Sequence, residues 1–211
     1  MTWTDGASYE GQWLEGFANG KGRFNHHYGD QYDGNWKNNK CHGYGVYTNK
    51  KGALYQGNWN NDQQEGHGEE VWPTGSKYDG AYYQGMKHGH GIYTWPDGSM
   101  YEGDWSENQI NGIGHYKWKN GRIYYGTWQN NLMNGIGIYI NDITYEGEYQ
   151  QDKRTGYGIY YWTDGRIYRG YWYNGSMHGL GIYTSSNKNK EKYGLWEMGK
   201  RICWFDQKSV E

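Results

Sequence analysis

Tyrosine recurs along the chain at an almost constant interval of 23 residues, and this period constrains the fold more than any other feature of the sequence. The repeated tyrosines are Tyr9, Tyr32, Tyr55, Tyr78, Tyr101, Tyr124, Tyr145 and Tyr168. Every step is 23 residues except the step of 21 between Tyr124 and Tyr145. A constant period of about 20–50 residues is typical of repeat architectures, in which each copy is one supersecondary unit.

Each copy carries the same residues at the same places when the repeated tyrosine is numbered position 0. Position 2 is Gly, position 4 is Trp or Tyr, position 7 is Gly, Asn or Asp, and positions 11 and 13 are Gly. Position 15 is aromatic in every full copy except at Glu70. A ninth, partial copy has Lys192 in the tyrosine place and ends the repeat region. In the fifth copy these places are Tyr101, Gly103, Trp105, Asn108, Gly112, Gly114 and Tyr116.

This spacing predicts one β-hairpin per copy. Positions 0, 2 and 4 alternate as one face of a strand, and so do positions 11, 13 and 15. The six-residue link between positions 4 and 11 carries turn residues at position 7. Folding the link back pairs position 0 with 15, position 2 with 13, and position 4 with 11. We therefore expect an indole or phenol ring to lie over bare glycine backbone.

A second link joins successive hairpins, and it often contains a turn pair such as Asp97-Gly98. In the short copy two residues are missing from this link, which leaves Asn141-Asp142 as a tight turn. Loss of two residues preserves the alternation of side chains, whereas loss of one would turn every side chain to the other face. The chain is thus predicted to be all-β, a meander of antiparallel hairpins.

The pattern resembles the MORN repeat (membrane occupation and recognition nexus), whose Tyr-x-Gly-x-Trp opening and Gly-x-Gly-x-aromatic closing match nearly residue for residue over about residues 1–204. The resemblance implies an elongated, twisted single-layer sheet with an aromatic-lined groove. It also implies a scaffold in a cytoskeletal, ciliary or membrane-contact assembly, often a dimer. The departures are Glu70, the Tyr82 and Tyr149 that replace Trp, and the short copy.

The repeat gives a domain organisation of four parts. Residues 1–8 parallel the end of a repeat, so they are the tail of a preceding copy or an N-terminal cap. Either the natural chain starts within a repeat, or this sequence is part of a longer protein. Residues 9–184 are eight MORN-type repeats, and residues 185–192 are a polar loop. Residues 193–211 are a partial ninth repeat with a C-terminal cap, since the ends of repeat arrays need covering.

Composition and charge argue against several classes of function. The 21 basic and 23 acidic residues nearly balance, which disfavours nucleic acid as a partner. Gly-x-Gly is followed by strand residues rather than by a helix, so it is not a nucleotide loop. The eight histidines and two cysteines lack the spacing of a metal site. No nucleophile has a base beside it, and we expect no catalytic site, metal or cofactor, in a soluble cytoplasmic protein.

The predicted function is a non-catalytic scaffold or adaptor that binds protein partners, as helical or extended peptides, in the aromatic groove. Groove contacts are assigned to the aromatic residues of the middle copies, with the alternative that these rings only form the structural stack. The residues are Tyr78, Tyr82, Tyr93, Tyr101, Trp105, Tyr116, Tyr124 and Trp128. Glu70 interrupts the aromatic pattern and is expected to mark one edge of the binding region.

Two other functions remain open at this point. The first is a phospholipid-binding module that tethers the protein to an anionic membrane surface through basic residues near the C-terminal end. These residues are Lys153, Arg154, Lys188, Lys190, Lys192, Lys200 and Arg201. The second is the regulatory repeat arm of a larger enzyme, such as a lipid kinase. A homodimer formed through a terminal repeat is also expected, because an open edge strand invites pairing. Localisation to the cytoskeleton, a cilium or the cytoplasmic face of a membrane follows from the resemblance.

Overall fold

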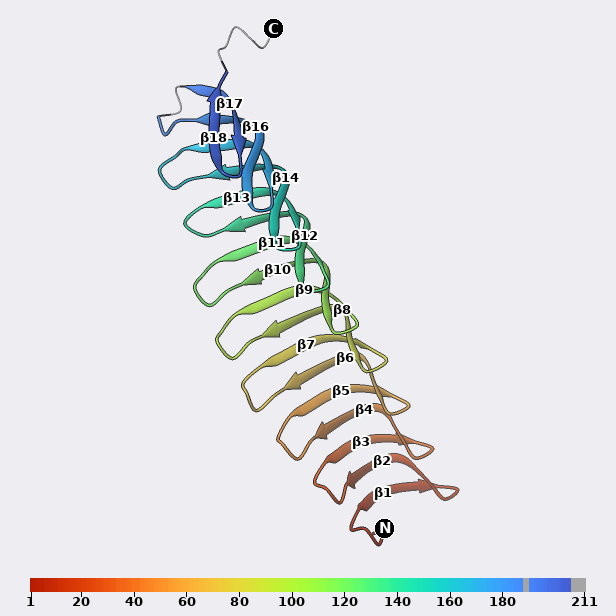
Figure 1. Ribbon diagram of the computed structural model, residues 1–211. Helices are drawn as coiled ribbons and strands as arrows, with labels where there is room; N and C mark the ends of the chain where they lie inside the picture. The colour runs from red at the N-terminus through yellow and green to blue at the C-terminus, as the bar shows by residue number, and fades with distance from the viewer. Residues whose placement is uncertain (188–189, 206–211) are drawn as a thin grey trace. The chain divides into compact units, whose positions relative to one another are not determined.

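The computed structural model describes residues 1–187 and 190–205, and these residues form strands and turns without any helix (Figure 1). The chain divides into two compact units, Met1–Gln109 and Ile110–Glu211, called unit 1 and unit 2 below. No helix in the described part of the chain is long and apolar enough to cross a membrane.

Unit 1 contains a run of antiparallel strands in which each strand pairs with the next in sequence. Its strands are β1 (Ser8–Leu14), β2 (Phe17–Asn25), β3 (Gln31–Lys37), β4 (Lys40–Thr48), β5 (Leu54–Asn60), β6 (Gln63–Val71), β7 (Lys77–Tyr83), β8 (Met86–Thr94) and β9 (Met100–Ser106).

Unit 2 repeats the same arrangement. Its strands are β10 (Gln109–Lys117), β11 (Ile123–Gln129), β12 (Leu132–Ile140), β13 (Thr144–Gln150), β14 (Lys153–Tyr161), β15 (Ile167–Tyr173), β16 (Ser176–Thr184), β17 (Glu191–Glu197) and β18 (Lys200–Trp204). The prediction of an all-β antiparallel hairpin meander is confirmed.

The turn inside each hairpin is shorter than the sequence suggested. Both strands run on past positions 4 and 11, so the six-residue link shrinks to the two residues at positions 6 and 7. In the second copy these are Asn38 and Asn39, with φ of 50° and 64°. Two consecutive positive φ values define the type I′ turn that matches the strand twist, and Asn and Gly tolerate them. This explains why position 7 is restricted to Gly, Asn and Asp.

The links between hairpins agree with the expected turn pairs. In the link of the second copy, the Asn49 amide donates to the Ala53 carbonyl at 2.9 Å, and Gly52 has a φ of 87°. In the short copy the link is three residues long, with the Asn141 amide donating to the Ile143 carbonyl at 2.8 Å. Tyr139 still pairs with Tyr145, so the alternation of side chains is preserved as predicted.

The hairpins of copies one to four and six to eight each contain a β-bulge that the sequence did not reveal. Tyr32 pairs with Tyr47 and Gly34 with Gly45, as expected, but the register then shifts and Trp36 pairs with Cys41 at position 9. Between these two pairs β3 advances by two residues and β4 by four, so the two extra residues lie on the second strand, among positions 10–12. The predicted pairing of position 4 with position 11 of the same hairpin is therefore wrong. The position-4 aromatic instead faces the position-11 glycine of the preceding copy, as Trp59 pairs with Gly43.

The ring that covers the glycines is the tyrosine at position 0, not the tryptophan. Tyr78 is fully buried and arches over Gly80 and Gly91, and a Cβ on Gly80 would lie 2.6 Å from the Tyr78 hydroxyl oxygen. The hydroxyl then donates to the carbonyl of Ala81, at position 3 of the same strand, at 3.0 Å. Positions 2 and 13 are glycine because no side chain fits beneath this ring.

The tryptophan at position 4 connects one copy to the one before it. The Trp36 indole N–H donates to the Gly22 carbonyl at 2.8 Å, and its ring meets the ring of Tyr9 edge to face at a centroid distance of 5.3 Å. The face that carries these tyrosine and tryptophan rings is called the inner face below. Positions 9, 15 and 17 lie on it as well, whereas positions 1, 12 and 14 lie on the outer face.

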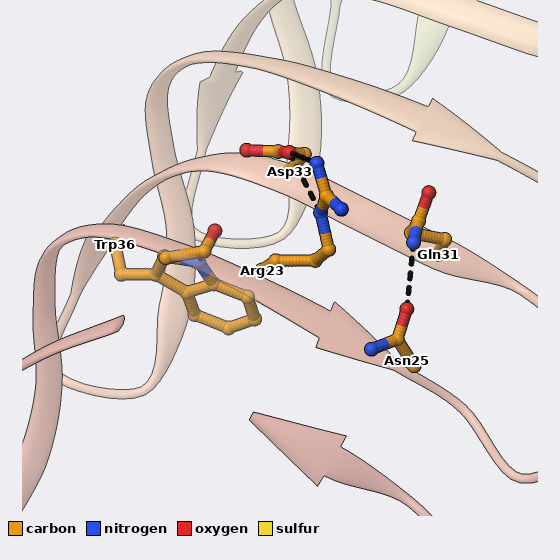
Figure 2. Close-up of polar contacts among 6 residues, drawn as sticks. Arg23, Asn25, Gln31, Asp33 and Trp36 are labelled. Atoms are coloured by element: carbon orange, nitrogen blue, oxygen red, sulfur yellow. Dashed lines mark hydrogen bonds and ion pairs between the residues drawn. The ribbon is translucent and has the colours of Figure 1, made fainter. Parts of the chain in front are cut away.

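The outer face of the hairpins carries polar pairs across strands. Figure 2 shows Arg23 on β2 beside Asp33 on β3, with the Arg23 Nε donating to the Asp33 carboxylate at 2.8 Å. In the same view the Gln31 amide donates to the Asn25 side-chain oxygen at 2.6 Å. These solvated pairs agree with the interpretation of position-1 carboxylates as surface residues.

The chain segments outside the full copies continue the same geometry. At the N-terminus the Trp3 amide donates to the Ala7 carbonyl at 2.9 Å, which reproduces the link between hairpins. In the partial ninth copy the tyrosine is replaced by Lys192, and the ring of Trp204 takes its place over Gly194. Trp204 also packs edge to face on Trp196 at 5.6 Å.

Candidate functional site

Most of the aromatic residues predicted to line a groove lie inside the packing of their own unit. Six of the eight expose 7% or less of their surface, namely Tyr78, Tyr82, Tyr101 and Trp105 in unit 1 and Tyr124 and Trp128 in unit 2. Only Tyr93 in unit 1 and Tyr116 in unit 2 are half-buried. The six buried rings form the structural stack, and the assignment of ligand contacts to this set stays a prediction.

The solvent-facing layer of the inner face is built from positions 15 and 17. In the fourth copy the ring of Tyr93 lies 4.6 Å from Trp95 and 6.1 Å from Trp105. Tyr116 and Trp118 repeat the first of these contacts at 4.6 Å. The position-17 tryptophans Trp95 and Trp118 thus each add a second ring beside a position-15 tyrosine.

The first copies of unit 1 enclose a large hollow in the inner face, with a volume of about 710 Å³. It is called the apolar hollow below, because aromatic side chains form most of its wall. Three of its rings are widely accessible or half-buried: Trp13 is 44% exposed, Trp3 is 38% exposed and Phe24 is half-buried. The lining residues are Met1, Trp3, Tyr9, Trp13, Gly16, Ala18, Phe24, His26, Tyr32, Trp36, Asn39, Cys41, Tyr47, Trp59 and Asp62.

Small residues at position 9 create this hollow. Ala18 and Cys41 occupy position 9 in the first two copies, where the fourth copy has Lys87. Position 17 is His26 and Asn49 there, instead of the tryptophans of the next copies. Both substitutions remove volume from the same part of the inner face. The hollow thus arises where the repeat keeps its aromatic rings at positions 0 and 4 but has smaller side chains at positions 9 and 17.

Cys41 is held in the wall of the apolar hollow as an inert thiol. Burial, with the nearby Asp62 carboxylate as the next cause, raises the pKa of Cys41 to about 12. A thiol needs a lowered pKa to act as a nucleophile at neutral pH. Burial likewise raises the pKa of the adjacent Tyr32 well above its usual range. Cys41 and Tyr32 therefore contribute apolar surface and hydrogen-bonding groups, in their protonated forms, to the wall of the hollow.

Glu70, which departs from the aromatic residue of the repeat, contacts side chains of the next copy. The Lys87 ammonium lies 3.5 Å from the Glu70 carboxylate, and the Tyr82 hydroxyl donates to the same carboxylate at 2.9 Å. The ammonium also lies 4.9 Å from the centre of the Trp72 ring and 5.1 Å from that of Tyr78. Lys87 fills the inner face at this point, and the apolar hollow does not extend to it.

Most of the basic residues predicted to face lipid line two hollows of unit 2, and their role toward lipid stays a prediction. In unit 2, Lys190, Lys192 and Arg201 line one hollow of about 470 Å³, while Lys153 and Arg154 line another of about 280 Å³ together with Asp152. Lys200 lines neither of these two hollows. Lys188 lies outside the described residues.

Among the described residues no group of three or more His, Cys, Asp and Glu is placed to hold a metal ion. Two of the histidines instead face outer-face carboxylates, as in the contact of His67 Nε2 with Asp79 at 2.9 Å.

Sequence reasoning missed the residues that shape the apolar hollow, since Ala18, Cys41, His26 and Asn49 vary between copies and carry no chemistry of their own. The signal in the sequence is the residue type at positions 9 and 17, which differs between the first two copies and the copies directly after them.

Comparison with known proteins adds two findings. The family model described as MORN repeat matches residues 9–25, 32–53, 55–77, 78–100, 101–121, 124–141, 145–165 and 168–190. A search of curated protein sequences gives no significant match.

Among solved structures, the fold is similar to the TCP10 domain of Danio rerio CPAP in complex with a peptide of Danio rerio STIL. The TM-score is 0.55 at 12% identity, over 97% of this chain and 91% of that one. The TCP domain of Drosophila melanogaster SAS-4 (dCPAP) in complex with a proline rich motif of Ana2 (dSTIL) matches at a TM-score of 0.40 and 10% identity, over 93% and 88%. The first likeness concerns the fold, and the second is too weak to carry an argument.

Proposed function

The chain belongs to the MORN-repeat family, and we propose that it is a non-catalytic scaffold that binds a short apolar peptide segment of a protein partner in the apolar hollow of unit 1. The observation that carries the proposal is the hollow itself, a cavity of about 710 Å³ walled by accessible rings. Ligand sites are concave, largely apolar and about 300–1,000 Å³ in volume.

The wall of the hollow suits peptide side chains. Trp3 and Trp13 offer large apolar faces that are already accessible. Trp and Tyr dominate binding hot spots because they bury much area at a low cost in conformational entropy. The His26 ring and the Asn39 side chain at the margin supply polar groups that orient a backbone. The surrounding β-hairpins hold these groups on a rigid support, so little ordering is required on binding.

The similar fold of the TCP10 domain supports peptide binding as a use of such a sheet, since that domain was solved with a peptide bound. It does not identify the partner. By extension from the family, we propose that the chain works in the cytoplasm at the cytoskeleton, in a cilium or at a membrane contact. Imaging of a tagged full chain after detergent extraction tests this, and a fully extracted pool contradicts it.

The test of the proposed function fills the hollow from within. A phage-displayed library of 12-residue peptides is selected on the full chain, and the enriched peptide is synthesised with a fluorescent label. The double variant Ala18→Met and Cys41→Met places at position 9 the residue that Met133 and Met177 supply in other copies. We expect its affinity for the peptide, measured by fluorescence polarisation, to fall at least tenfold.

The matched control is Ile110→Met, which makes the same type of change at position 9 of a unit-2 copy. It is expected to bind the peptide as the unmodified chain does. Equal binding by the filled double variant, or an equal loss in the control, would show that the ligand does not occupy the apolar hollow.

A further inference from the structure

Unit 2 contains a second hollow on its inner face with a different chemical character. Its volume is about 470 Å³, and it is called the basic hollow below. Its lining residues are Trp162, Arg166, Met177, Tyr183, Ser185, Lys190, Lys192, Trp196, Arg201 and Trp204. Four of these ten residues are cations and none is a carboxylate. Four are aromatic, so the charges sit in an apolar wall.

The end of the repeat pattern creates this hollow. In the full copies position 0 is a buried tyrosine, but in the partial ninth copy it is Lys192, which is exposed. Trp204 covers Gly194 in place of the missing phenol. The Lys192 ammonium lies 5.3 Å from the centre of the Trp204 ring, and the Arg201 guanidinium lies 4.5 Å from it. Both cations thus lie against the ring of Trp204.

These cations lack a counter-charge among the described residues. Arg166 is paired, because its Nε donates to the Asp164 carboxylate at 2.7 Å. Within residues 1–187 and 190–205, no carboxylate lies within 4 Å of the side-chain nitrogens of Lys190, Lys192 or Arg201. The neighbouring Glu191 is engaged elsewhere, with Arg169 at 3.1 Å. The hollow consequently has a surplus of positive charge.

We propose that the basic hollow is a docking site for an acidic peptide segment, in which a Glu or Asp side chain is flanked by apolar residues. The Arg201 guanidinium presents two parallel N–H donors that match a carboxylate, and Lys192 adds a point charge beside it. The rings of Trp162, Tyr183 and Trp204 would bury the flanking apolar side chains. Charge and shape therefore select one class of partner.

A peptide suits this geometry better than a membrane does. Electrostatic recruitment to anionic lipid requires about four to eight Lys or Arg gathered on one surface that meets the bilayer. Here the unpaired cations that line the hollow are three, and two of them lie against a ring in its wall. Arg154 lies in another hollow, 4.7 Å from the centre of the Trp172 ring. An inserting side chain can reach such sites more easily than a flat lipid surface can.

The experiment compares two fluorescein-labelled 12-residue peptides of alternating Glu and Leu or alternating Gln and Leu, each kept below its aggregation limit. Binding to the full chain is measured by fluorescence polarisation at low and at physiological salt. We expect the Glu peptide to bind at least tenfold more tightly than the Gln peptide at low salt, with the difference shrinking as salt rises.

The double variant Lys192→Gln and Arg201→Gln is expected to lose this preference, while Lys192→Arg with Arg201→Lys keeps it. The matched control Lys153→Gln and Lys200→Gln removes the same charge from unit 2 outside the basic hollow and is expected to leave the preference unchanged. Equal binding of the two peptides overturns the proposal. So does an equal loss in the control variant, which would indicate diffuse attraction by surface charge.

Vesicles containing phosphatidylserine distinguish the membrane from the peptide. If the chain sediments with these vesicles in a manner that depends on Lys192 and Arg201 while the Glu peptide fails to bind, the proposal is wrong and the hollow serves an anionic headgroup. The outcome is independent of the apolar hollow, because filling position 9 with Ala18→Met and Cys41→Met should leave binding of the Glu peptide unchanged.

Discussion

The apolar hollow of unit 1 and the basic hollow of unit 2 are built on the same framework yet differ in what they can bind. Both lie on the inner face, beside buried tyrosines that cover glycine backbone. In the first copies of unit 1 the rings at positions 0 and 4 are all present and the position-9 side chains are small, so apolar rings are uncovered. In unit 2 the repeated tyrosine is replaced by Lys192 in the last copy, and lysine and arginine side chains line the space there.

This difference separates the residues that fold the chain from those that specify its ligands. Positions 0, 2, 4 and 13 hold each hairpin and its contact with the next one, and they hardly vary. Position 9 varies from Ala18 to Ile110 to Arg154 without disturbing the register. A repeat array can therefore change its binding surface copy by copy, because each copy contacts mainly its neighbours.

The largest expected effect concerns the response of both units to high pH. Burial is the first cause of a raised pKa for a set of tyrosines in each unit. They are Tyr9, Tyr32, Tyr47, Tyr55, Tyr78, Tyr82 and Tyr101, and then Tyr124, Tyr145, Tyr149 and Tyr168.

In the folded chain these phenols stay protonated at pH values at which the unfolded chain has lost their protons. In the unfolded chain that loss is centred on the ordinary tyrosine pKa of 10.0. Because the pKa is raised in the folded chain, this stabilisation is complete below pH 10 and is progressively lost as the pH rises above it. We expect both units to unfold above pH 10. Methyl NMR of Ile, Leu and Val, with circular dichroism, follows this, and a fold that is unchanged at pH 12 would contradict it.

The next effect tests whether the framework is equivalent in the two units. Tyr78→Ala in unit 1 and Tyr145→Ala in unit 2 each remove a fully buried ring from above two glycines. Each should lower the free energy of unfolding by about 3–5 kcal/mol, as large aromatic truncations do. Denaturant unfolding measures it. The controls Tyr78→Phe and Tyr145→Phe lose only the hydroxyl bond and should cost about 1 kcal/mol. A cost in one unit alone would show that the frameworks differ.

A smaller effect concerns the place where unit 1 departs from the repeat. Lys87→Met and Glu70→Tyr each leave the other member of the ion pair without its partner, whereas the double variant restores an apolar inner face. We expect the double variant to lose less stability than the sum of the losses in the two single variants. The difference, which is the coupling energy, should be about 1–3 kcal/mol. Thermal or denaturant unfolding of the four proteins measures the coupling. Strict additivity would mean that Glu70 and Lys87 do not depend on each other.

The smallest effect concerns position 9 of unit 2. The Arg154 guanidinium lies 4.7 Å from the centre of the Trp172 ring and 5.3 Å from that of Tyr160. Arg154→Met, which copies Met177, should cost about 0.5–1 kcal/mol through the lost cation–π contact. The matched variant Met177→Leu should change stability by less. A stabilised Arg154→Met protein would indicate that desolvation of the guanidinium outweighs its contact with the rings.

The repeat period predicted the hairpin meander from residues that have local roles. The positive φ of the position-7 residues, such as Asn39, and the turn glycines, such as Gly52, can be anticipated from residue type. The parity of the short copy also followed from counting. The aromatic groove was only partly anticipated, because residue type does not tell which side of a ring is covered by the next copy. Tyr101 is fully buried while Tyr93 is half-buried, although both are tyrosines of one face.

The sequence by itself determined the order of the strands, the places of the turns and which face the aromatic residues occupy, because strand alternation and turn preferences act over a few residues. Only the tertiary structure decided that the tyrosine rather than the tryptophan covers the glycines. The extra residues among positions 10–12 shift the register so that Trp36 pairs with position 9 of its own hairpin, while its indole N–H donates to the Gly22 carbonyl of the preceding copy. The hollows were also decided at this level, since an empty space depends on side chains brought together from different copies.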